Sequence, residues 1–493
     1  MHPAFVEALV LGIIGISGVS IGLLLGIRQI APLFVLALAA STVVRTWSAF
    51  AMWSVGRPEW TLEAWLGASV LVSVTAAVSH WRHWRPALAS IGVFAVASLS
   101  ALATKYLFDI GERHHSDSAS VFALSVVAIQ GDIPTTEQIA GSFKRGVTYP
   151  LMLALGPEGR ILSAYTPLVY LSMLGAAVWL AWVLIGKQVP GRVFIGVVGI
   201  VAAFSLTVPM FRAAMFYING HTLIALAVTL LVAGFFLARQ QQSFGPVPMA
   251  FTVLGGSLGA TSRIEGIVLV LVVLVALVGQ RWWSSTSDRF RLFAALSLTG
   301  LSLSWWMSSL NSPALDRLGV SEWLLVPMSL VGSTIAASSW IDPIRQWLLP
   351  GLAAGLFLLL ARVVWQSADP IGMVLAQWPN LGLGRGGWGT AAHVFIGSAV
   401  LLGLRRRSRE YRWLLSLSVL IIGAILFSKT FDGGFGREGF YDSVNRMWLH
   451  VMPVIITTTL VGYSELIHSL RHRNKNDDFS ITSQENQQSR AGN

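Results

Sequence analysis

Three carboxylates lie close together in a polar segment about a quarter of the way along the chain. The segment opens with the stretch Asp109-Ile-Gly-Glu-Arg-His-His-Ser-Asp-Ser118. A carboxylate can accept a proton from an attacking hydroxyl group, so Asp109, Glu112 and Asp117 are each candidates for a general base. Asp117 could instead cap a short amphipathic helix predicted over 118–130, because Asp is a frequent N-cap residue.

Two adjacent histidines in the same segment raise the question of a metal site. Histidine is a common metal ligand, and His114 and His115 lie close to Asp117 in the sequence. Adjacent side chains on a strand or a helix point in different directions, so this pair is a poor set of two ligands. We therefore expect polar loop histidines and no certain cofactor, and a divalent metal remains the alternative.

Cations close the same segment, which ends in Lys144-Arg-Gly-Val-Thr-Tyr-Pro150. Lys144 and Arg145 could bind a phosphate, which Arg can hold through two parallel hydrogen bonds. Contact with lipid headgroups is the alternative. Tyr149 is a candidate substrate-binding residue, and a second short interfacial helix is predicted to begin at Pro150 after a turn at Gly146.

Two further ionisable residues, Arg263 and Glu265, separate two apolar runs that would otherwise almost merge into one. They lie in the stretch Thr261-Ser-Arg-Ile-Glu-Gly266. Ionisable residues at such a depth are costly, so they are usually paired or functional. Arg263 and Glu265 are two residues apart and cannot face each other on a helix, which requires a tight turn or other partners. The two hypotheses are a structural pair that braces the helices and a pair that lines a donor or acceptor site.

Two more loops carry candidate binding residues. Tyr217 and His221 lie in a short loop, where they could contact a sugar or an acceptor, or could cap two helices. Arg446 precedes the last apolar run, and His450 follows about one turn later. The glycine-rich loop before Arg446 is not a P-loop, because no Gly-Lys-Ser/Thr follows its glycines.

Composition indicates the kind of fold that must position these residues. The chain has 493 residues, of which 54% are hydrophobic and 12% charged, and its mean hydropathy is +0.66. Soluble domains carry about 25% charged residues. Lipid offers no partner to backbone polar groups, and the apolar runs are continuous rather than alternating, which favours helices over a barrel. We predict an all-α, polytopic transmembrane helical bundle of about 13–15 spans, with amphipathic interfacial helices in the first large loop.

The predicted spans share a length and an apolarity suited to crossing a bilayer. In chain order they are 5–26, 31–53, 65–80, 86–108, 162–186, 193–210, 222–238, 248–260, 267–280, 292–310, 324–340, 347–365, 391–404, 413–427 and 447–468.

Charge predicts the orientation of the bundle. Short basic loops alternate with longer loops of mixed charge, and the clusters at 405–412 and 471–475 both belong to the basic set. Cytoplasmic loops carry an excess of Lys and Arg, so the longer loops are predicted to lie outside: 109–161, 211–221, 311–323, 366–390 and 428–446. The net charge of +11 is then explained by topology and lipid headgroups, and no nucleic-acid partner is expected. The absence of cysteine excludes thiol catalysis and cysteine-ligated metals.

The order of these features resembles the GT-C membrane glycosyltransferases, the superfamily of the protein O-mannosyltransferases and the lipid A aminoarabinose transferases. An apolar span is followed by an acidic residue, a short amphipathic helix and Arg-Gly-x-x-Tyr-Pro at 145–150. The stretches at 261–266 and Asn-Arg-x₆-Pro at 445–453 come later. The resemblance covers roughly 86–468. The chain departs from it in its three additional spans before residue 86 and in having Asp117-Ser118 where the family has an Asp-Glu pair.

The resemblance implies transfer of a sugar from a polyprenyl-phosphate donor to an acceptor outside the membrane. It selects Asp117 as the general base of an inverting transfer and Arg446 as a ligand of the donor phosphate, with Arg263, Lys144 and Arg145 as further phosphate ligands. The expected substrate-binding residues are Tyr149, Glu265, Tyr217, His221 and His450. Some members of the superfamily use a divalent metal and others do not.

These expectations also define domains, partners and location. Residues 1–85 would be extra N-terminal helices, 86–470 the catalytic region with its outer loop at 109–161, and 471–493 a disordered cytoplasmic tail. The partners would be the polyprenyl-phosphate sugar, membrane lipids and an acceptor glycan, lipid or protein. The protein would be a multi-pass protein of the plasma or inner membrane with its site facing outside. A transporter or flippase, and an envelope polysaccharide polymerase or ligase, are the alternative functions.

Overall fold

The structure is a computed structural model that describes most of the chain. The described residues are 3–108, 146–156, 162–186, 189–216, 220–280, 285–309, 322–366, 375, 378–405, 409–431 and 446–470. None of them forms a strand, so the prediction of an all-α protein is confirmed within this part of the chain.

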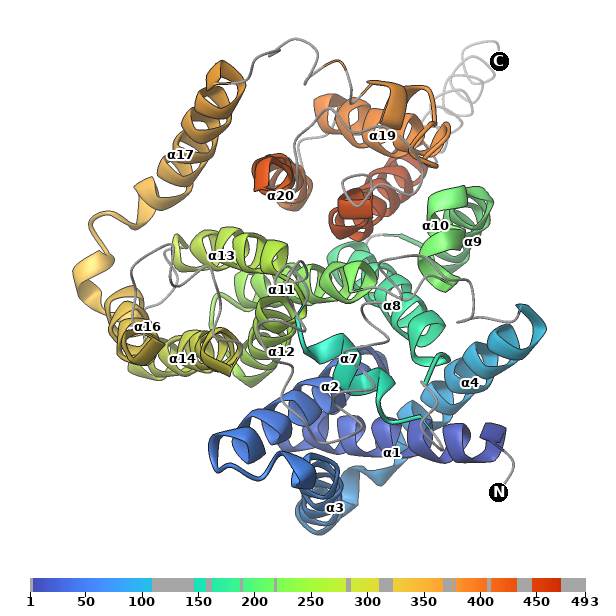
Figure 1. Ribbon diagram of the computed structural model, residues 1–493. Coiled ribbons are helices and arrows are strands. Elements are labelled where there is room, and N and C mark those ends of the chain that lie inside the picture. The colour runs from blue at the N-terminus through green and yellow to red at the C-terminus, as the bar shows by residue number, and fades with distance from the viewer. Residues whose placement is uncertain are drawn as a thin grey trace, which may run out of the picture.

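Helices follow one another along the described chain (Figure 1). The first half contains α1 (Pro3–Leu24), α2 (Ile30–Ser54), α3 (Thr61–Ser79), α4 (Trp84–Phe108), α7 (Thr148–Leu153), α8 (Tyr165–Ile185), α9 (Gly191–Thr207), α10 (Pro209–Phe216) and α11 (His221–Gln241). The second half contains α12 (Pro246–Ser262), α13 (Ile264–Val278), α14 (Thr286–Ser309), α16 (Glu322–Ala337), α17 (Arg345–Gln366), α19 (Ala391–Arg405), α20 (Arg409–Phe431), the 3-10 turn η6 (Met447–His450) and a helix over 452–470.

Every predicted span overlaps a helix, but only eight helices of the described chain, or nine if one bent pair counts as a single span, are long and apolar enough to cross a membrane. The described helices therefore support a multi-pass membrane protein. The larger number of about 13–15 spans stays a prediction. One predicted span is wrong as a single helix: the run at 193–210 breaks into α9 and α10, which are bent by 86°. Pro209 accounts for the break, because a proline disfavours helical geometry in the residue before it, and Val208 is extended with ψ 122°.

The short helix α7 forms where a second interfacial helix was predicted, but its residues are not exposed on the surface of the protein. All six of its residues are buried, and it packs between α2 and α12. Its residues therefore belong to the protein interior. The other predicted interfacial helix, over 118–130, lies outside the described residues.

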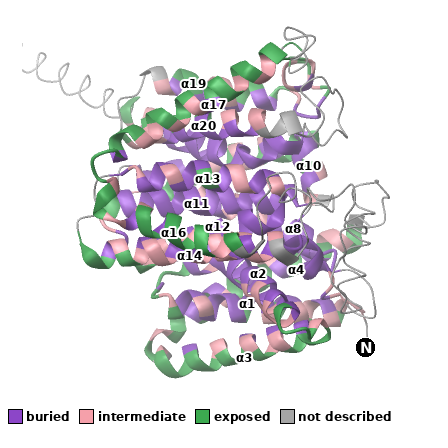
Figure 2. Ribbon diagram, turned by 60° about the vertical axis from the view of Figure 1, so that its left-hand side comes forward, coloured by how far each residue is buried: buried purple, intermediate pink, exposed green. Residues whose placement is uncertain are grey.

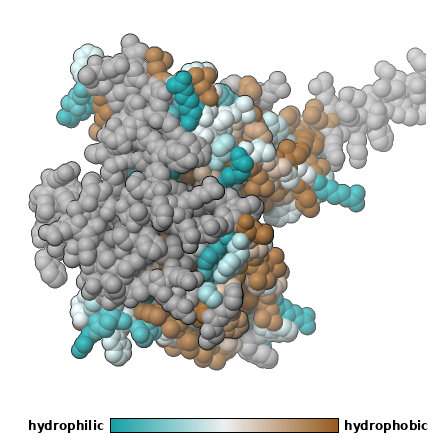
Figure 3. Space-filling view, turned by 45° about the vertical axis from the view of Figure 1, so that its right-hand side comes forward, coloured by the Kyte–Doolittle hydropathy of each residue, from teal (hydrophilic) through white to brown (hydrophobic). Residues whose placement is uncertain are grey.

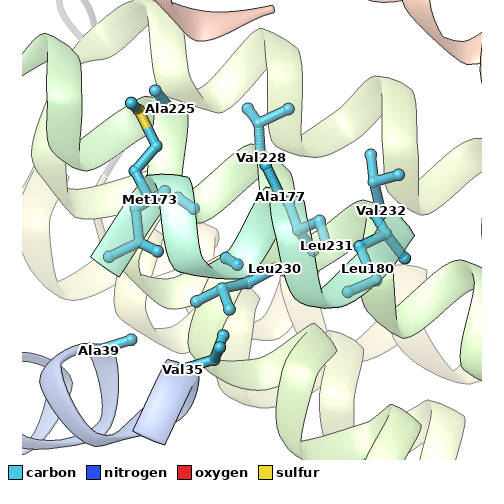
Figure 4. Packing of buried hydrophobic residues seen from close by; sticks show 14 of the residues in the cluster. Val35, Ala39, Met173, Ala177, Leu180, Ala225, Val228, Leu230, Leu231 and Val232 are labelled. Atoms are coloured by element: carbon cyan, nitrogen blue, oxygen red, sulfur yellow. The ribbon is translucent and has the colours of Figure 1, made fainter. Parts of the chain in front are cut away.

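The centre of the bundle is α11, in which every residue from His221 to Arg239 is buried. Side chains of α8 such as Met173 and Leu180 pack against Val228 and Val232 of α11, and Val35 of α2 packs on the other side (Figure 4). Burial is greatest along these central helices, whereas α3 at the margin carries many exposed residues (Figure 2). Apolar side chains cover much of the described surface beside the grey residues, as a surface in contact with lipid requires (Figure 3).

Some polar contacts between segments mark the two ends of the bundle. The first, here called the arginine end, contains Arg239 bonded to Gln280 and Arg289 bonded to Asp342. These residues come from or adjoin loops that charge predicts to be cytoplasmic. The second, here called the site end, joins the chain at Gly146 to α12 and joins α10 to Gly387. Loops predicted to lie on one face therefore meet at one end.

The N-terminal helices continue the bundle without a linker. Helix α1 crosses α2 so closely at Gly18 that an added Cβ would lie 1.8 Å from the carbonyl oxygen of Ala37. The buried Glu7 of α1 and the partly buried Lys105 of α4 form an ion pair. Helix α4 packs against α1, α2 and α8, so it links the three additional helices to the rest of the protein.

Candidate functional site

The candidate site is built around a one-residue break between α12 and α13 at the site end. Helix α12 ends at Ser262, α13 begins at Ile264, and Arg263 between them has an extended backbone with φ −166° and ψ 159°. The first turn of α13 returns close to α12, because a Cβ at Gly266 would lie 2.1 Å from the carbonyl oxygen of Gly259. A glycine is required there, and the break becomes a tight elbow.

The elbow provides the turn that the spacing of Arg263 and Glu265 requires. The guanidinium of Arg263 donates from Nη2 to Oε1 of Glu265 at 2.9 Å and from Nε to Oε2 at 3.1 Å. The side chains are only 8% and 3% exposed. This is a buried, bidentate pair, so each charge has a partner where an isolated charge would be costly.

A pair of histidines lies beside the ion pair. His221 begins α11 and His450 ends η6, and Nδ1 of His221 lies 2.9 Å from Nε2 of His450. An N–H···N hydrogen bond needs one donor and one acceptor, so the accepting ring carries no proton on that nitrogen. The charges of Glu265 and Arg263 both act on His450. The two pairs therefore form one electrostatic cluster.

Neighbouring backbone fixes this cluster in place. Gly220, directly before His221, packs on the aliphatic part of Arg263, with 3.3 Å between the position of an added Cβ and Cγ of the arginine. Arg446 is buried at the N-cap of η6, one turn before His450. Nδ1 of His450 is buried and has no hydrogen-bond partner among the described residues. It remains available to a polar group that enters the cluster.

The chain that leaves the first large loop docks on the same elbow. The N–H of Gly146 donates to the carbonyl of Ser262 at 2.8 Å. Thr148 donates to Oγ1 of Thr261 at 2.6 Å, and Thr46 of α2 donates to Thr148. Threonines therefore tie α2, α7 and α12 together directly beside Arg263.

The structure brings together Arg263, Glu265, His221, His450 and Arg446 among the residues predicted from sequence. Tyr149 points elsewhere: it is buried, hydrogen-bonded to Thr166 of α8, and packed against Tyr165 with 5.6 Å between ring centroids. The remaining predicted residues lie outside the described part of the chain: Asp109, Glu112, His114, His115, Asp117, Lys144, Arg145 and Tyr217.

The described residues contain no group of three or more His, Asp or Glu side chains suited to holding a metal ion. The predicted ligands His114 and His115 are outside them, so the metal hypothesis stays a prediction.

Two features of the site were not predicted. The threonine contacts of Thr46, Thr148 and Thr261 join residues far apart in the sequence, and threonine is too common in apolar helices to single them out. The close approach of Gly220 to Arg263 left only a weak signal in the sequence, namely that a glycine directly precedes the candidate residue His221.

Comparisons with known proteins do not assign this site to a family. No protein-family model matches the chain, and neither the curated proteins nor the solved structures yield a significant match.

Proposed function

We propose that the protein is a GT-C-type membrane glycosyltransferase. It would move a sugar from a polyprenyl-phosphate donor to an acceptor glycan, lipid or protein on the outer face of the membrane. Asp117 would be the general base of an inverting transfer.

The observation that carries this proposal is the convergence of cations and histidines at the end of the bundle where the long polar loop returns. Arg263 and Arg446 are both buried there. The described chain resumes at Gly146, bonded to the elbow directly after Lys144 and Arg145. A phosphate leaving group needs such cations, because negative charge grows on it as the bond to the sugar breaks.

The proposed reaction balances without a cofactor. The acceptor hydroxyl oxygen attacks the anomeric carbon, and the bond between that carbon and the phosphate oxygen breaks. The electron pair leaves with the polyprenyl phosphate, and the hydroxyl proton goes to the carboxylate of Asp117. Arg446, with the Arg263–Glu265 pair beside it, would stabilise the departing phosphate.

The distribution of polar residues favours a transferase over a transporter. A translocation path requires polar or ionisable groups through the depth of the membrane. The central helix α11 is buried from His221 to Arg239, and between these two residues its only polar side chains are Thr222 and Thr229. The chemistry-bearing groups of the described chain instead concentrate at its site end.

Mass spectrometry of envelope lipids and glycans from cells with and without the gene tests the proposal. We expect one class of glycan or lipid to lose a single sugar when the gene is deleted, and Asp117→Asn to reproduce that loss with normal protein levels. Glu59→Gln, which removes an exposed carboxylate, is the control and should restore the sugar. Identical glycan profiles with and without the gene would refute a transferase.

Arg446→Ala tests the phosphate role separately. Loss of a charge-assisted hydrogen bond costs roughly 1.5–3 kcal/mol, so the apparent affinity for the donor should fall about tenfold or more. Arg57→Ala removes an exposed arginine and should leave the affinity unchanged. The measurement is the KM for the polyprenyl-phosphate sugar in purified membranes, and equal values for Arg446→Ala and wild type would remove Arg446 from the donor site.

A further inference from the structure

Arg45 is a buried cation that the proposed function does not use. It lies in α2 at the site end and is 2% exposed. Its Nη1 donates to the carbonyl of Thr61 at the start of α3, and its Nε has no hydrogen-bond partner among the described residues. No carboxylate of the described chain forms an ion pair with it. Glu63 attracts it electrostatically, but Glu63 is exposed.

A buried arginine in this environment requires a negatively charged partner. A guanidinium has five N–H donors and always carries a positive charge. A buried charge without a hydrogen-bonded partner is strongly destabilising, and an ionisable residue within a membrane helix is a candidate functional site. A backbone carbonyl can accept a hydrogen bond from Arg45 but cannot neutralise it.

Two further donors without partners lie on the same face of α3. Trp65 and Ser69 follow Thr61 at intervals of four residues, and all three are buried. Nε1 of Trp65 and Oγ of Ser69 have no hydrogen-bond partner among the described residues. Helical side chains lean toward the N-terminal end of their helix, so Trp65 leans toward the turn whose carbonyl binds Arg45.

We propose that Arg45 and Trp65 form a binding site for a phosphate group within the N-terminal helices, distinct from the elbow at Arg263. The orphaned atoms of both residues are donors and one side chain is cationic, so the ligand must be an acceptor with negative charge. Arginine holds phosphate oxygens in pairs, which suits the Nε and Nη edge of Arg45.

The depth of the donors points to a phospholipid as the source of that phosphate. Ser69 lies about 12 Å along α3 from Thr61 and therefore deeper in the membrane. In a phospholipid the ester groups also lie deeper than the phosphate, so Ser69 is placed to donate to an ester oxygen. The outer face of α3 is apolar and exposed at Val70, Leu71 and Val74, as expected beside lipid. A free phosphate would use Arg45 and Trp65 alone.

Native mass spectrometry of the full chain, after extensive washing in detergent, tests the site. We expect the wild-type protein to retain one phospholipid and Arg45→Gln to retain it several-fold less. Arg57→Gln, an exposed arginine beyond the end of the same helix, should behave as wild type. Inorganic phosphate is added in a second experiment, with chloride at equal ionic strength as the control. A rise in melting temperature with phosphate in wild type but not in Arg45→Gln, without a retained lipid, would assign the site to free phosphate.

Trp65→Phe keeps the experiment decisive if Arg45→Gln fails to fold. It removes the indole N–H and retains an aromatic ring, so the protein should fold while retaining at least twofold less lipid or losing its response to phosphate. Equal lipid retention and an equal phosphate response in wild type and Trp65→Phe would overturn the proposal.

Discussion

Arg263 shows how one residue between two helices can set the chemistry of a site. Its extended backbone lets its side chain reach Glu265 two residues later. In an uninterrupted helix these two side chains would not face each other. The pair is nearly excluded from solvent, and its two opposite charges both act on the neighbouring His450. A phosphate entering the cluster would meet an arginine already oriented by its carboxylate partner.

Glu265→Gln should destabilise the protein, because it leaves the charge of Arg263 buried without a counter-ion. Breaking a buried ion pair from one side costs about 3–5 kcal/mol. Thermal unfolding in detergent micelles measures the effect as a lowered melting temperature. The matched control is Glu59→Gln, which removes one partner of the exposed Arg57–Glu59 pair and should cost less than about 1 kcal/mol. Equal melting temperatures for the two variants would show that the Arg263–Glu265 pair is not a buried constraint.

At the scale of elements, the site depends on close approaches between chain segments rather than on any one helix. The elbow between α12 and α13 closes because Gly266 lies against the backbone of Gly259. The chain at Gly146 lies equally close to the end of α12, where an added Cβ would be 1.9 Å from the carbonyl oxygen of Thr261. Both contacts position backbone against backbone, so neither can relax by rotating a side chain.

Gly146→Ala should therefore separate the returning loop from the elbow. We expect a lower melting temperature and reduced transfer activity, since the added methyl group forces the backbone of α12 or of the loop to move. Gly67→Ala places a methyl group where nothing lies within 4 Å, and it should leave both properties near the wild-type values. Wild-type activity in Gly146→Ala would show that the docking of this segment does not position the site.

At the scale of the whole molecule, the bundle has a site end and an arginine end. Arg239 at the arginine end is bonded to Gln280 and lies over the ring of Trp413, with 4.8 Å between its Cζ and the ring centroid. The positive-inside rule predicts that this end faces the cytoplasm. The proposed transfer would then take place on the opposite face.

Cysteine labelling tests this orientation directly, because the chain has no cysteine of its own. Glu59→Cys lies at the site end and Gln241→Cys at the arginine end, and both positions are exposed. A membrane-impermeant maleimide added to intact cells should label the first variant, and the second only after permeabilisation. Labelling of both variants from the same side would contradict a bundle with two opposed ends.

The sequence by itself determined where the helices form. Lipid offers no hydrogen-bond partner to the backbone, so each apolar run must satisfy its polar groups within a helix, and this requirement is local. Every predicted span accordingly overlaps a helix, with the break at Val208 as the exception that Pro209 imposes. The costly ionisable residues Arg263 and Glu265 were also visible, because charge is rare in such a chain.

Only the tertiary structure decided which residues meet. His221 and His450 are 229 positions apart, and Thr148 and Thr261 are 113 apart. A helix such as α11 is apolar on all sides, so its sequence carries no periodic signal to show which face meets which neighbour. Packing makes that choice through glycine contacts and threonine hydrogen bonds. For the same reason Tyr149, a plausible ligand in the sequence, is directed into the core by Thr166.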